Sequence, residues 1–104
     1  MSRELCSLES EHGVLGALLR AAVQQDTALV DQVVETITAA DFYFDDNAAL
    51  FQTIADLHAE GVPVDPVTIA QVRPTLPSNG RTLAYAGEIA MNVPSTANWR
   101  TYAR

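Results

Sequence analysis

The fold of this chain is decided by residues 45–61, DDNAALFQTIADLHAEG. Apolar side chains recur there at intervals of three and four residues, which is the spacing of one face of an α-helix. Acidic residues open the stretch, and negative charges are favoured at the N-terminal end of a helix. Gly61 closes it, and glycine is the residue that most often follows the end of a helix. We therefore expect a helix with one buried face, formed by Leu50, Phe51, Ile54 and Leu57.

Two helical patterns precede this stretch. The first covers residues 8–24, and the second begins after Asp26, a residue type that caps helix N-termini. Thr38 and Asp41 have the spacing of a capping box and predict a short helical turn through Phe42. The apolar faces of the two helices are expected to be Leu8, Leu15, Leu18, Leu19 and Ala22 in the first, and Leu29, Val30, Val33, Val34 and Ile37 in the second.

Three shorter helices are predicted downstream. Asp65 followed by Pro66 combines a capping residue with proline at the first helical position, and Pro74 ends the helix that begins there. Residues 74–80 are rich in Pro, Ser, Asn and Gly and predict a loop before a fifth helix. Pro94 breaks that helix, and a last one follows. The inward positions are expected to be Val67, Ile69 and Val72 in the fourth helix and Leu83, Ala86, Ile89 and Ala90 in the fifth. Ser95 is expected to cap the last helix, which begins with Ala97, Trp99 and Tyr102.

Together these patterns predict the fold class. No segment alternates with the period of two that strands require, so we expect an all-α fold, a compact bundle of about six helices. The length fits a single domain over residues 1–104. The chain ends inside a helical pattern, so we expect it to be a piece of a longer protein. The side chains expected in the core are Leu15, Leu18, Leu19, Val33, Ile37, Phe42, Leu50, Phe51, Ile54, Leu57, Ile69 and Ile89.

The charge balance excludes some classes of function. Thirteen acidic residues oppose six arginines, no lysine is present, and the net charge is −7. Because nucleic-acid affinity depends on clustered basic side chains, the scattered arginines argue against direct duplex binding. The same acidity argues against docking on anionic membranes, and no apolar run approaches the roughly 20 residues of a membrane span. The single cysteine, Cys6, cannot form an internal disulfide and no signal peptide is visible, so we expect a cytoplasmic protein.

The sequence predicts no catalytic residue, no bound cofactor and no metal site. A phosphate-binding loop needs a lysine, and this chain has none. Cys6, His12 and His58 lack the spacing of metal ligands, although a site built from the two histidines with acids is conceivable. Carboxylate pairs such as Glu9 with Glu11 and Asp45 with Asp46 are expected to serve as helix-start charges rather than as acid–base groups.

The aromatic side chains divide into two groups. Phe42, Phe51 and Tyr43 lie beside apolar helical positions and are expected in the core. Tyrosine and tryptophan are also favoured at protein interfaces, and three of them gather towards the C-terminal end. These candidates for a partner interface are Tyr85, Trp99 and Tyr102, with the core as the alternative for each of them.

The landmarks along the chain resemble the N-terminal domain of DnaB-type replicative DNA helicases. The resemblance extends over residues 8–103, and its strength lies in five segments that occur in the family's order and spacing. These segments are LESE (8–11) with VLGALL (14–19), DFY (41–43), LF (50–51) with Ile54, GVPVD (61–65) with VT (67–68), and a closing group of Tyr85, VPS (93–95), AN (97–98) and YA (102–103).

The resemblance implies a function that composition and periodicity do not show. Such helicases are hexameric rings that unwind DNA at the replication fork, and ATP and Mg are bound by a motor domain that these residues do not include. The N-terminal domain is a helical head followed by a helical hairpin, which is missing here. The heads form a collar that supports ring assembly and on which primase docks. The implied partners are therefore other helicase subunits and primase, with DNA contacted only through the parent ring.

This chain also departs from the family pattern. Asn47 and Ala48 stand where the family commonly has histidine and arginine, and Arg81 and Thr82 stand in place of a glycine pair. A stand-alone helical regulator, such as a helicase-like decoy or a loader antagonist, is the alternative reading. A hairpin and a phosphate-binding loop encoded beyond Arg104 would favour the helicase, and a stop codon would favour the regulator.

Overall fold

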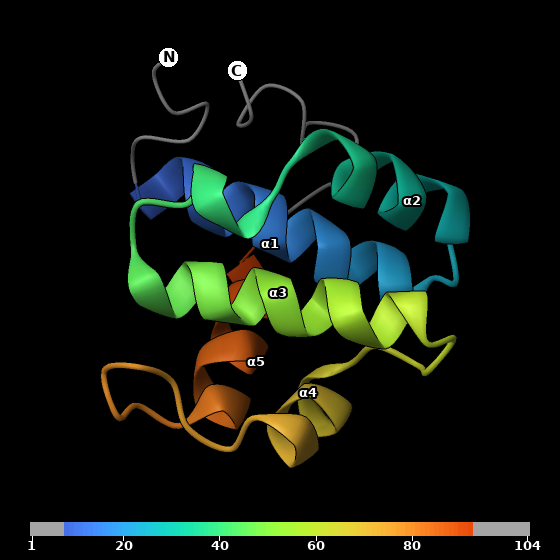
Figure 1. Ribbon diagram of the computed structural model, residues 1–104. Helices are drawn as coiled ribbons and strands as arrows, with labels where there is room; N and C mark the ends of the chain where they lie inside the picture. The colour runs from blue at the N-terminus through green and yellow to red at the C-terminus, as the bar shows by residue number, and fades with distance from the viewer. Residues whose placement is uncertain (1–7, 93–104) are drawn as a thin grey trace.

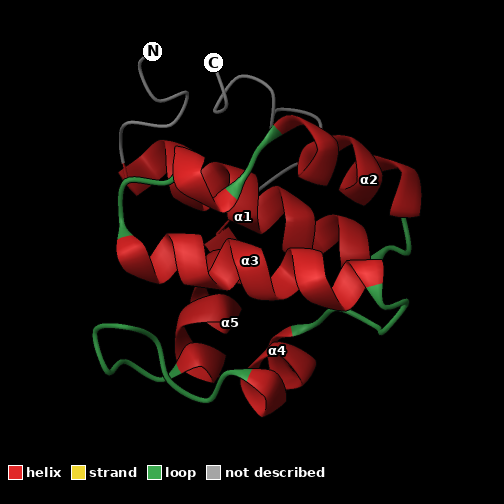
Figure 2. Ribbon diagram, viewed as in Figure 1, coloured by secondary structure: helices red, strands yellow, loops and turns green. Residues whose placement is uncertain are grey.

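The computed structural model describes residues 8–92, which form five α-helices and one 3-10 turn (Figure 1). Within this part of the chain there is no β-strand, only an isolated bridge between Thr75 and Arg81 (Figure 2). The expected all-α fold is confirmed. The elements are α1 (Leu8–Val23), α2 (Thr27–Thr36), the 3-10 turn η1 (Ala39–Asp41), α3 (Asp45–Ala59), α4 (Pro66–Val72) and α5 (Thr82–Asn92).

Helix α1 is the centre of the bundle, because α2, α3 and α5 all pack against it. Figure 1 shows α3 lying alongside α1, with α2 above them and α4 and α5 below. Helix α4 completes the lower layer by contacting both α3 and α5. The central position explains why α1 carries the longest run of buried residues, 13–19.

The twelve side chains predicted to form the core of the bundle, from Leu15 to Ile89, are all buried, whereas Tyr43, which was also expected there, is exposed. The expectation was wrong at the margins, since Leu8, Val67, Val72 and Leu83 are largely exposed. Helix α4 explains two of these errors, because it has only seven residues and buries a single one, Ile69. A helix of two turns presents one narrow row of side chains to its neighbours, so the flanking valines remain in contact with solvent.

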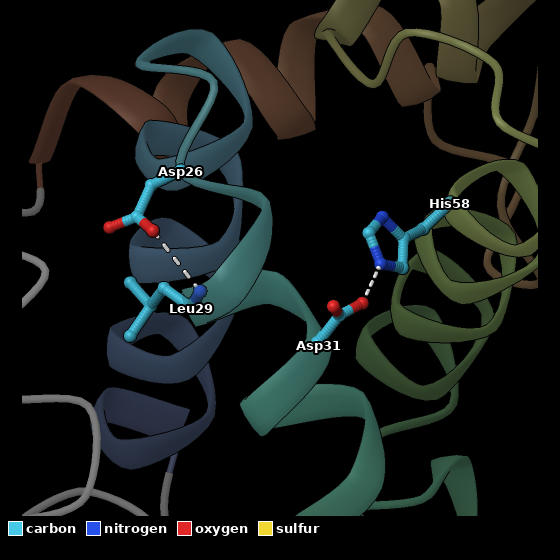
Figure 3. Close-up of polar contacts among 4 residues, drawn as sticks. All are labelled: Asp26, Leu29, Asp31 and His58. Carbon is cyan, nitrogen blue, oxygen red and sulfur yellow. Dashed lines mark hydrogen bonds and ion pairs between the residues drawn. The ribbon is translucent and has the colours of Figure 1, made fainter.

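The predicted helix ends are confirmed where the structure describes them. The Asp26 carboxylate accepts a hydrogen bond from the Leu29 N–H at 3.2 Å (Figure 3), and the Asp65 carboxylate accepts one from the Thr68 N–H at 2.8 Å. Thr38 and Asp41 form the predicted capping box at η1. Gly61 follows the end of α3 with a φ of +74°, a left-handed conformation in which a side chain would be strained. The break at Pro94 and the last predicted helix lie outside the described residues.

The loop of residues 74–80 is held against the start of α3. The Asp46 carboxylate accepts hydrogen bonds from both the Ser78 N–H, at 3.0 Å, and the Ser78 hydroxyl, at 2.6 Å. Asp46 was expected to act only as a helix-start charge. It also fixes this loop beside the segment that joins η1 to α3.

Candidate docking surface

Glu11 is the most unusual residue of the described chain, because its charged side chain is completely buried. One carboxylate oxygen accepts a hydrogen bond from the Tyr43 N–H at 2.7 Å. The other accepts one from the Asn47 amide at 2.8 Å and a longer one from the Phe44 N–H at 3.4 Å. These donors surround the first turn of α3, where the helix dipole also favours an anion. Glu11 therefore ties α1 to the start of α3, which is more than the helix-start role predicted from its position.

A chain of hydrogen bonds continues from Glu11 to the surface. The Tyr85 hydroxyl lies 2.5 Å from the Asn47 carbonyl oxygen and 2.7 Å from Nε2 of His12. A carboxylate only accepts hydrogen bonds, so the Asn47 amide must donate to Glu11 and its carbonyl oxygen must accept from Tyr85. The Tyr85 hydroxyl then accepts from His12, which places the proton of the neutral imidazole on Nε2. The network thus links α1, which carries Glu11 and His12, to α3 through Asn47 and to α5 through Tyr85.

Burial shapes the protonation of the network's two outer members. It lowers the pKa of His12, although the carboxylates of Glu11 and Glu88 oppose the effect. It raises the pKa of Tyr85 to about 12, and the negative charges of Asp46, Glu11 and Glu88 add to that rise while the hydrogen bond to Asn47 opposes it. Both shifts favour the neutral forms that the network uses.

The raised pKa of Tyr85 predicts a loss of stability at alkaline pH. From about pH 10 upwards the unfolded chain loses the tyrosine proton while the folded chain keeps it until about pH 12. The contribution of Tyr85 to the free energy of unfolding is thus complete below about pH 10 and declines as the pH rises from about 10 to about 12. Urea unfolding at several pH values between 9 and 12 measures the decline. We expect the Tyr85→Phe variant to lack this decline in stability between pH 10 and 12. The Tyr43→Phe variant, the matched control, should still show it.

Next to the network lies a group of exposed or half-buried apolar and aromatic side chains, which we call the aromatic edge: Leu8, Tyr43, Phe44 and Tyr85. Tyr43 is 66% exposed and its ring meets that of Phe44 edge-on, with centroids 5.1 Å apart. Phe44, Leu8 and Tyr85 line a shallow groove of about 440 Å³, together with Asp46 and Pro77. An apolar patch of this kind, rimmed by polar residues, is typical of a surface that binds another protein.

The structure corrects the expected role of Tyr43 and describes only one of the three predicted interface residues. Tyr43 was expected in the core, but the segment after η1 is extended, so Phe42 points inward and Tyr43 outward. Tyr85 is half-buried and lies in the groove of the aromatic edge. Trp99 and Tyr102 lie outside the described residues.

Neither the exposure of Phe44 nor the structural role of Glu11 was predicted from the sequence. Alternation through the extended segment 42–44 would have turned Tyr43 away from Phe42, but it would also have turned Phe44 inward, so it does not predict the exposed pair of rings. No local pattern shows that Glu11 is buried, because its partners lie more than thirty residues away.

The two histidines bind different partners. His12 contacts Tyr85, whereas Nε2 of His58 pairs with the Asp31 carboxylate at 2.5 Å and links α3 to α2 (Figure 3). Residues 8–92 contain no group of three His, Cys, Asp or Glu side chains arranged to hold a metal ion. In the same range, no helix has both the length and the apolar character that crossing a bilayer requires.

Known proteins with similar sequences are replicative helicases. The chain is 33% identical over 102 residues to the replicative DNA helicase DnaB of Buchnera aphidicola subsp. Baizongia pistaciae, and 29% identical over 99 residues to that of Pasteurella multocida. Each alignment covers 93% of this chain and 20% of the relative. The chain thus spans about a fifth of the length of these curated relatives.

A solved structure shares the fold. The crystal structure of the N-terminal domain of DnaB helicase from Mycobacterium tuberculosis superimposes with a TM-score of 0.73 at 30% sequence identity, covering 93% of this chain and 68% of that one. The model of the family described as the DnaB-like helicase N terminal domain matches residues 3–104. This chain therefore belongs to the family of DnaB-like helicase N-terminal domains.

Proposed function

We propose that this chain is the assembly and partner-docking domain of a hexameric, ATP-dependent replicative DNA helicase. It contributes to the collar of the ring and binds primase in the cytoplasm. The family match over residues 3–104 is the observation that carries the proposal. In the parent protein, ATP and Mg²⁺ are bound by the motor domain, and DNA is contacted through the ring as a whole.

The aromatic edge is the surface that we assign to the docking of primase. Its exposed members include tyrosine and phenylalanine, which are enriched at the centres of protein interfaces. Their backbone is fixed before any partner arrives, because the buried Glu11 carboxylate holds the N–H groups of both Tyr43 and Phe44. A surface ordered in advance loses less conformational entropy on binding, which favours affinity.

Isothermal titration calorimetry of this chain with primase from the same source tests the proposal. We expect saturable binding with a defined stoichiometry and a negative heat-capacity change, because apolar surface would be buried. Absence of binding at concentrations up to about 1 mM, which corresponds to roughly 4 kcal/mol of binding free energy, would refute the docking role.

A further inference from the structure

A second groove lies at the other end of the long helices. It has a volume of about 690 Å³ and forms where the ends of α1 and α3 meet the start of α2 and residues 61–65. Its apolar lining comes from α1, α2 and the segment after α3, and it shares no residue with the groove of the aromatic edge. The apolar lining residues are Ala22, Val23, Val30, Val62, Pro63 and Val64.

The apolar wall of this groove is incompletely covered. Val23, in the last turn of α1, is 67% exposed, and Pro63, in the segment after α3, is also exposed. Val30, which also lines the groove, belongs to the buried core. A concave site of several hundred cubic ångströms with mostly apolar walls has the dimensions of a binding pocket.

The charges around the groove are negative. Asp65 lines it, and Asp26 and Glu60 directly adjoin lining residues in the sequence. No arginine is among the lining residues. Residues 8–92 hold twelve of the chain's thirteen acids but only three of its six arginines, so the described part is strongly acidic throughout.

Two polar contacts lie near the groove (Figure 3). The Asp31–His58 pair joins α2 to α3, and Asp26 caps the N-terminus of α2 a little further along. His58 also lines the groove. The Asp31–His58 pair thus links α2 to α3 beside the groove.

We propose that this groove binds a basic amphipathic helix of another protein. The helix would place two or three apolar side chains against Val23, Val30 and Val62, and lysine or arginine side chains near Asp26 and Glu60. This is the helix-in-groove mode of recognition, with electrostatic complementarity selecting the partner. A second copy of this chain is a poorer occupant, since it would bring acidic residues against an acidic rim.

A designed probe tests the proposal. The probe is a fluorescein-labelled helical peptide of about sixteen leucines and lysines, with leucine at the three- and four-residue spacing of one helical face. Fluorescence anisotropy with the complete 104-residue chain measures its affinity. We expect Val23→Gln, and independently Pro63→Gln, to weaken binding about fivefold or more. Val72→Gln is the matched control, because Val72 is 62% exposed but lies on α4 outside the groove.

Two further measurements complete the test. A peptide with glutamine in place of every leucine keeps the charge and should bind at least about fivefold more weakly if apolar contacts matter. Equal binding of the two peptides, or equal effects of Val23→Gln and Val72→Gln, would show that charge alone is responsible and would overturn the proposal. Sedimentation equilibrium that reveals a dimer dissociated by Val23→Gln would also overturn it, by assigning the groove to a second copy.

Discussion

Replacement of Glu11 with alanine should lower the free energy of unfolding by about 3–5 kcal/mol. The substitution removes the acceptor of the Tyr43 N–H, the Phe44 N–H and the Asn47 amide at once. The Asn47 donor is buried and the other two are partly buried; each buried donor left without an acceptor costs about 1–3 kcal/mol, and access of water to the partly buried ones reduces the sum. Urea denaturation followed by circular dichroism measures the change.

Two companion variants show whether the carboxylate itself is responsible. Glu9 shares the first turn of α1 but is exposed, so Glu9→Ala should change stability by no more than about 0.5 kcal/mol. Glu11→Gln keeps the shape and one acceptor oxygen but turns an amide N–H₂ towards donors, so an intermediate loss of at least about 1 kcal/mol is expected. If Glu11→Ala is no more harmful than Glu9→Ala, the network does not hold the bundle together as described.

Replacement of Ile54 with alanine should destabilise the chain by about 2–5 kcal/mol. Ile54 is fully buried on α3, the helix that contacts α1, α4 and η1. The substitution removes apolar contacts and leaves a cavity that close-packed neighbours fill only in part. Thermal and urea unfolding both report the loss.

The matched control for Ile54→Ala is Val67→Ala. Val67 also belongs to an apolar helical pattern and was expected to point inward, but 57% of it is exposed. Its truncation should therefore change the free energy of unfolding by no more than about 0.5 kcal/mol. Comparable losses for the two variants would mean that α4 is packed differently.

The elements that were predicted correctly from the sequence are those whose signals are local. The apolar face of α3 repeats at helical spacing from Leu50 to Leu57, and Asp65 with Pro66 marks the start of α4 through backbone chemistry confined to a few residues. Helix α4 itself was placed correctly, but its short length left no periodicity from which the exposure of Val67 and Val72 could be deduced.

The candidate site was less predictable because it depends on contacts between distant segments. Glu11 has the same sequence context as the exposed Glu9, and only the arrival of residues 43–47 against α1 makes it a buried hydrogen-bond acceptor. Tyr85 was identified as an interface candidate from its residue type, whereas its hydrogen bonds to His12 and Asn47 required the packing of α5 on α1. Local patterns thus predicted the helices but not the network that joins them.

The central claim, that the aromatic edge is the docking surface for primase, is tested most directly by titrating primase into Tyr43→Ala and Val72→Ala variants by calorimetry. Both side chains are largely exposed, so both variants should keep the stability of the unaltered chain. We expect Tyr43→Ala to weaken the affinity by at least about 1 kcal/mol, roughly fivefold, and Val72→Ala to leave it unchanged. Unchanged affinity in Tyr43→Ala, or an equal loss in both variants, would contradict this assignment.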